Sequence, residues 1–119
     1  MAGLMQITER VVGDVTILAL EGHLILDEGD TALRDYINRI VDQGRVKIVL
    51  DMQNVTRLDS AGIGMLVSKY LSAQKRGGTI KLLHLTQRSD HIMDITRLTT
   101  VFEIFDDEAE ALRSFGAAT

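Results

Sequence analysis

The sequence predicts an α/β domain with a mixed sheet of about five strands and four helices, in the order ββαβαβαβα. Segments rich in β-branched residues alternate with segments of helical periodicity, and this alternation implies parallel strands joined by right-handed crossovers. The chain opens with two strand-like runs separated only by Gly13 and Asp14, which suits a tight hairpin and adds an antiparallel pair. With 119 residues and no linker or repeat, we expect one domain over residues 1–119.

The first half of the chain contains three expected strands and two expected helices. Strands are expected at residues 5–12, 15–21 and 46–52, the last nearly all apolar, as in a central strand buried on both faces. A helix is expected over 31–43, with Gly44 as its stop. A second helix is expected over 60–76, and its apolar spacing predicts one buried face made of Ile63, Leu66, Val67, Tyr70 and Leu71.

The second half repeats the alternation less regularly. Strands are expected at residues 79–85 and 102–105, with a helix over 88–98 between them. Asp107 and Glu110 have the spacing of a capping box, which predicts the start of a last helix. These elements complete the predicted order.

Composition excludes several classes of function. The net charge of -4 argues against binding a phosphate backbone, because nucleic-acid binders carry a basic face. The absence of Cys excludes disulfides and thiolate chemistry. No segment has the length of a membrane span or the pattern of a signal peptide, so we expect a cytoplasmic protein.

The segment VTRLDSAGIGML (residues 55–66) is the candidate functional site, because it joins a polar stretch to an apolar helix. Its glycines, Gly62 and Gly64, fit neither a dinucleotide fingerprint nor a P-loop, since the third glycine and the Gly-Lys-Ser/Thr are missing. Ser60 lacks the flanking glycine of a hydrolase elbow, and the three His residues are scattered. We therefore expect no enzyme activity, no metal and no cofactor.

Asp51 raises an alternative, because it ends a strand where a response-regulator receiver carries its phosphoacceptor. A receiver also needs an acidic pair after its first strand to hold Mg²⁺, and the sequence has none there. The simpler interpretation is that Asp51 is a strand-end residue bonded to nearby amides.

Ser60 itself can be a substrate for a kinase. Asp59 is a suitable N-cap, which places Ser60 at the first helical position with its hydroxyl outside the hydrogen-bond ladder. A phosphate there adds about -1.5 to -2 charges, which a helix N-terminus tolerates. It would make dianionic the near-neutral patch of Ala61, Gly64 and Met65 that a partner meets, and would thereby expel the partner. On these grounds alone, the alternative that Ser60 is only a capping residue stays open.

The residues Asp59 to Leu66 (DSAGIGML), with VLDM at 49–52 before them, resemble the signature of STAS domains and, more narrowly, of the bacterial anti-sigma factor antagonists. Weaker similarity extends over nearly the whole chain, including EGHL at 21–24, KLLHL at 81–85 and the passage from 95 to 106. This resemblance implies the STAS fold, with Ser60 as the phosphorylated residue.

The resemblance also implies partners. The unphosphorylated protein binds an anti-sigma factor that is also a serine kinase and so frees a sigma factor, and a metal-dependent serine phosphatase reverses the modification. The expected contact residues are Asp59, Ser60, Ala61, Gly62, Gly64 and Met65, with His23 and Asp27 from a preceding loop. Many relatives have an acid where this chain has Ile25, which leaves the contacts within residues 23–30 open, and Thr56 is a second hydroxyl nearby. The alternative function is a STAS subunit of a stress-sensing complex or of a membrane transporter assembly.

Overall fold

The computed structural model describes residues 5–26, 29–85 and 100–116. Along the chain the elements are β1 (Gln6–Val12), β2 (Val15–Leu24), α1 (Asp30–Asp42), β3 (Lys47–Leu58), α2 (Ser60–Lys75), β4 (Thr79–Leu83), β5 (Ile104–Phe105) and α5 (Glu108–Arg113). The strands form one sheet in the order β1-β2-β3-β4-β5. The β1–β2 pair is antiparallel and the other three pairs are parallel, so the predicted mixed α/β sheet is confirmed.

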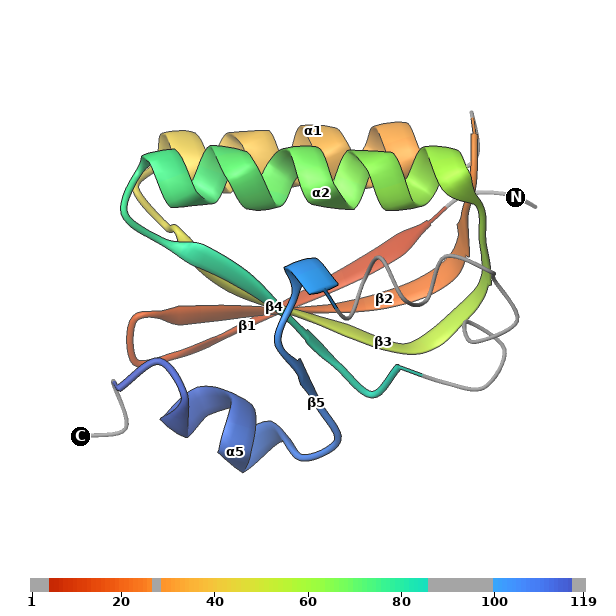
Figure 1. Cartoon of the computed structure of the whole chain (residues 1–119). Coiled ribbons are helices and arrows are strands. Elements are labelled where there is room, and N and C mark those ends of the chain that lie inside the picture. The colour runs from red at the N-terminus through yellow and green to blue at the C-terminus, as the bar shows by residue number, and fades with distance from the viewer. Residues whose placement is uncertain (1–4, 27–28, 86–99, 117–119) are drawn as a thin grey trace.

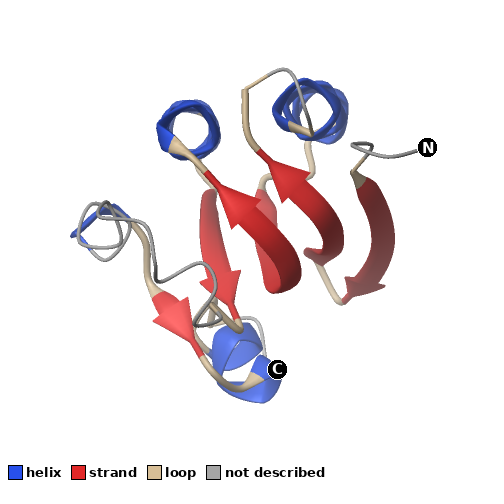
Figure 2. Ribbon diagram, turned by 90° about the vertical axis from the view of Figure 1, so that its right-hand side faces the viewer, coloured by secondary structure: helices blue, strands red, loops and turns tan. Residues whose placement is uncertain are grey.

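Helices cover both faces of the sheet. Figure 1 shows α1 and α2 side by side over one face and α5 against the opposite face, and Figure 2 shows the same layers with α1 and α2 nearly end-on. The larger apolar core includes Leu33 and Ile37 of α1 and Leu66 of α2, together with buried side chains of the sheet. A smaller core, which includes Val49 and Ala111, joins the other face of the sheet to α5. The segment 88–98, where a fourth helix is predicted, lies outside the described residues.

Strand β3 is longer than the sequence predicts, because it continues from Met52 to Leu58 through the segment expected to be a polar loop. This extension pairs in parallel with the end of β2, where the register shifts between Ala19 and Glu21 and again between Gly22 and His23. Val55 and Leu58 are buried along it. Their three-residue spacing hid the strand, since a regular strand buries every second residue.

Two further expectations are wrong. Leu71 is 54% exposed rather than buried. It follows Ser60 by about three helical turns, so it shares the exposed side of α2. Strand β4 ends at Leu83 rather than at Leu85, because His84 has a φ of 58° that breaks the extended backbone. The predicted cap of the last helix is present, as the Asp107 carboxylate accepts a hydrogen bond from the Glu110 amide.

Candidate functional site

Asp59 organises the junction between β3 and α2. It has an extended backbone, and its Oδ1 accepts a hydrogen bond from the Gly62 amide at 3.0 Å, which is the geometry of an N-cap. Its Oδ2 accepts a second hydrogen bond from the Leu26 amide at 3.1 Å. One carboxylate therefore caps α2 and also ties the loop between β2 and α1 to the helix start. The sequence predicts the cap, but not the contact with Leu26.

Gly62 allows α2 to begin directly against the end of β2. A Cβ built on Gly62 would lie 2.2 Å from the backbone oxygen of Leu24 and 3.0 Å from the side chain of Leu58. No real Cβ approaches a backbone oxygen so closely, so only glycine fits without moving the helix. Gly62 is buried as a result, and its role in the structure is to permit packing.

The outward side of the same turn is open. Ser60 is exposed, Ala61 is partly buried, and Gly64 is exposed with no atom within 4 Å of a Cβ built on it. Residues four apart lie on the same side of a helix, so Ser60 and Gly64 share one surface. Apart from Leu26, whose amide bonds to Asp59, this surface presents small side chains beside a free hydroxyl.

Met65 does not belong to that surface. Its side chain is only 8% exposed and belongs to the larger core, together with Ile63 and Leu66. Met65 follows Gly64, so it lies about 100° further around the helix, on the side that faces the sheet. Exposed Met65 is thus a wrong expectation, and the open surface consists of Ser60, Ala61 and Gly64.

The loop after β2 lies next to this surface. His23 is partly buried and lies opposite Arg57 in the β2–β3 register, while Leu26 is 63% exposed. Gly29, at the start of α1, lies against the end of β2, since a Cβ built on it would lie 1.9 Å from the backbone oxygen of His23. Asp27, the other predicted contact residue, lies outside the described residues.

The first backbone amides of α2 can receive an anion. The Gly62 amide is bonded to the Asp59 carboxylate and the Ile63 amide to the Asp59 carbonyl oxygen at 3.0 Å. Within the described part of the chain, no acceptor contacts the amides of Ser60 and Ala61. The first turn of α2 contains no acidic residue, so its partial positive charge is not offset from within the helix.

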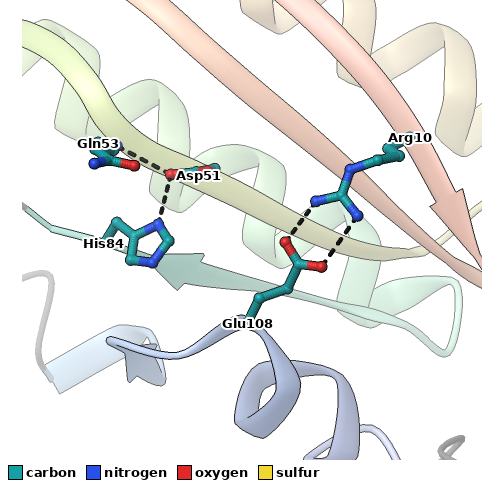
Figure 3. Close-up of polar contacts among 5 residues, drawn as sticks. All are labelled: Arg10, Asp51, Gln53, His84 and Glu108. Atoms are coloured by element: carbon teal, nitrogen blue, oxygen red, sulfur yellow. Dashed lines mark hydrogen bonds and ion pairs between the residues drawn. The ribbon is translucent and has the colours of Figure 1, made fainter.

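A second polar cluster lies across the sheet, near α5 (Figure 3). Asp51 accepts a hydrogen bond from the Gln53 amide and lies 3.1 Å from Nδ1 of His84. Arg10 donates two hydrogen bonds to Glu108, at 3.0 and 2.5 Å. These bonds lower the pKa of Glu108 and raise the pKa of Arg10, in each case against the opposing effect of burial. The Arg10–Glu108 pair joins α5 to β1.

The predicted role of Asp51 is correct in its bond to a nearby amide, but Asp51 lies within β3 rather than at its end. Among the described residues, no group of three or more His, Cys, Asp or Glu side chains is arranged to hold a metal ion. None of the helices in this part of the chain combines the length and hydropathy that a bilayer span requires.

Comparisons with known proteins agree with this architecture. Residues 6–111 match the model of the STAS domain. The anti-sigma F factor antagonist of Paenibacillus polymyxa is 26% identical over 98 residues, covering 82% of this chain and 84% of that protein. The anti-sigma-B factor antagonist of Bacillus subtilis is 31% identical over 72 residues, covering 60% of this chain and 65% of the relative.

A solved structure has the same fold. The phosphorylated form of the Bacillus cell fate determinant SpoIIAA superposes with a TM-score of 0.68 at 19% identity, covering 93% of this chain and 98% of that one. The family model spans nearly all of the described elements, from β1 into α5. The chain belongs to the STAS domain family.

Proposed function

We propose that the chain is an anti-sigma factor antagonist switched by phosphorylation of Ser60. In the unphosphorylated form it binds an anti-sigma factor that is also a serine kinase, and this binding frees a sigma factor. Phosphate on Ser60 ends the complex, and a metal-dependent serine phosphatase restores it. The chain acts by binding and needs no cofactor and no direct contact with nucleic acid.

Two kinds of similarity support this proposal. The relatives from Paenibacillus polymyxa and Bacillus subtilis are both named as antagonists of anti-sigma factors. The structural neighbour SpoIIAA is named as an anti-sigma factor antagonist, and it has been solved in a phosphorylated and an unphosphorylated form. At least one neighbour with the same fold therefore exists in both a phosphorylated and an unphosphorylated form.

The observation that carries the proposal is the exposed hydroxyl of Ser60 beside two backbone amides without an acceptor in the described chain. A phosphate placed there gains from those amides and from the helix dipole. The Asp59 cap uses the Gly62 amide instead, so the modification does not have to displace it. Phosphorylation can thus change the surface without unfolding the helix start.

The surface it changes is small and uncharged apart from Asp59. Ser60, Ala61 and Gly64 let a partner approach the helix closely, and a dianionic phosphate adds both volume and charge at that point of approach. A tightly packed interface loses affinity when a charge is placed in it without a counterion. Repulsion and steric exclusion both act in the same direction, against the complex.

The first experiment maps the acceptor with the cognate anti-sigma kinase and ATP. Intact mass analysis should show one added phosphate on the wild type and none on Ser60→Ala. Ser68→Ala is the matched control, because Ser68 is also exposed on α2 but lies about two turns further along. If Ser60→Ala accepts phosphate as fully as the wild type, the assignment of the site is wrong, and Thr56 becomes the next hydroxyl to replace.

A further inference from the structure

The outer edge of β1 is an exposed strand edge. β1 is the first strand in the sheet order and pairs only with β2 among the described strands. Figure 2 shows it at the border of the sheet. All its residues except Ile7 are exposed, and Val11 and Val12 are 54% and 38% exposed. An edge strand of this kind carries a row of free backbone groups that can pair with another strand.

The register identifies which backbone groups point outward. Val12 and Val15 flank the two-residue turn, where Gly13 has the positive φ of 62° that such turns need, so these two residues are bonded to each other. Bonded and non-bonded pairs alternate along an antiparallel ladder. The N–H and C=O groups of Ile7, Glu9 and Val11 therefore point away from β2.

The charged side chains of β1, Glu9 and Arg10, form ion pairs on the two faces of the sheet. Glu9 is held on the helix-covered face, where Arg45 donates to it at 2.6 Å and Tyr36 at 2.5 Å. Arg10 is held on the opposite face by Glu108. Lys and Pro, which commonly block edge strands, are absent from QITERVV. Each charge is thus paired within the chain, Glu9 on one face of the sheet and Arg10 on the other.

We propose that β1 pairs antiparallel with β1 of a second copy of this chain, with Glu9 opposite its own equivalent. In this register Ile7 lies opposite Val11 of the second copy, and Thr8 lies opposite Arg10. The strand Gln6–Val12 is then matched along its full length, and Ile7, Glu9 and Val11 exchange their outward hydrogen bonds with the second copy. The two sheets become one continuous sheet across a two-fold axis.

The side chains favour this occupant and this register. Ile7 packs against the larger core, and Val11 of the second copy would lie opposite it. This contact would cover the exposed Val11 side chain and extend apolar surface that is already present. Glu9 lies opposite Glu9 of the second copy, and each carboxylate already has its own counterion, since Arg45 of the same chain lies 2.6 Å from it. A shift to the next hydrogen-bonded register in either direction would place Glu9 opposite Ile7 or Val11 and would separate these two apolar side chains.

Analytical ultracentrifugation of the full chain over a wide concentration range tests the association. The mass of the wild type should rise towards twice that of the monomer. Val11→Pro removes one outward N–H without touching the β1–β2 ladder, and it should stay monomeric. Val11→Thr is the matched control, because it also shortens the apolar contact but keeps the N–H, and it should still dimerise.

Hydrogen exchange identifies the surface. The amides of Ile7, Glu9 and Val11 should become protected as concentration rises, while those of Thr8 and Arg10 are protected throughout. If Val11→Pro proves unfolded by circular dichroism, Val11→Lys supplies the monomeric variant, since it places a charge against Ile7. The proposal is overturned if the wild type stays monomeric, or if it dimerises without new protection at these three amides. The proposed dimer does not depend on Ser60. A negative kinase assay would therefore not count against the dimer, and a monomeric protein would not count against phosphorylation of Ser60.

Discussion

The first turn of α2 has an inward and an outward side that differ in what constrains them. On the inward side, Gly62 touches the backbone of Leu24 and Ile63 is buried, so the rest of the domain dictates each residue. On the outward side, Ser60 is exposed and Gly64 has open space around it. Both sides carry a glycine, but only Gly62 is required by the fold.

This difference shows where a function can reside. Glycine within a helix costs about 0.5–1 kcal/mol relative to alanine, and Gly62 offsets that cost by close packing. Gly64 has no such compensation in the described structure. We propose that Gly64 is present because a partner packs closely against the helix next to Ser60, where a larger side chain would interfere. Substitutions at three positions test this contrast.

Gly62→Ala should have the largest effect. Its Cβ would meet the backbone oxygen of Leu24 at 2.2 Å, and a backbone atom cannot turn away as a side chain can. We expect a loss of about 2–3 kcal/mol or more in the free energy of unfolding, measured by urea denaturation. If the free energy of unfolding fell by no more than it does for an ordinary surface substitution, α2 would not pack closely against the end of β2.

Replacing Asp59 should have an intermediate effect that separates its two contacts. Asp59→Ala loses both the cap on Gly62 and the bond to Leu26, and we expect it to cost about 1–2 kcal/mol of unfolding free energy. Asp59→Asn can keep the cap through its oxygen, but its NH₂ group cannot accept a bond from the Leu26 amide. The asparagine variant should therefore be the more stable of the two, with faster hydrogen exchange at Leu26. If the two variants were equally stable and hydrogen exchange at Leu26 were unchanged, the bond between the Leu26 amide and Asp59 would not contribute to stability.

Gly64→Ala should have the smallest effect on stability and the opposite sign. With open space around the Cβ, alanine should raise the free energy of unfolding by about 0.5–1 kcal/mol. The same variant should bind the proposed anti-sigma partner more weakly, as measured by calorimetry, because the added methyl group would lie in the proposed contact surface. If the variant were more stable but bound the partner with unchanged affinity, Gly64 would not be part of the contact surface.

The start of α2 is predictable from the sequence because its determinants are local. Asp59 caps an amide three residues away, and the exposure of Ser60 follows from its place at the first helical position. The order of the described strands and helices follows in the same way from periodicity and turn residues. These features depend on neighbours in the chain.

What escaped prediction depends on segments far apart in the chain. The bond from the Leu26 amide to Asp59 joins residues separated by 33 positions. The burial of Met65 and the exposure of Leu71 depend on how α2 is rotated against the sheet, and the contact of Gly62 with Leu24 sets that rotation. The extension of β3 to Leu58 depends on the register shifts in its pairing with β2. None of these leaves a local pattern.

The most direct test of the proposed switch compares one protein in two states. The affinity of the wild-type chain for its anti-sigma kinase is measured before phosphorylation, after phosphorylation at Ser60 and after treatment with a serine phosphatase, with circular dichroism recorded each time. We predict loss of binding on phosphorylation, recovery on dephosphorylation and an unchanged fold throughout. Equal affinity in the two states would contradict the account, and so would a loss of binding that coincides with loss of helix.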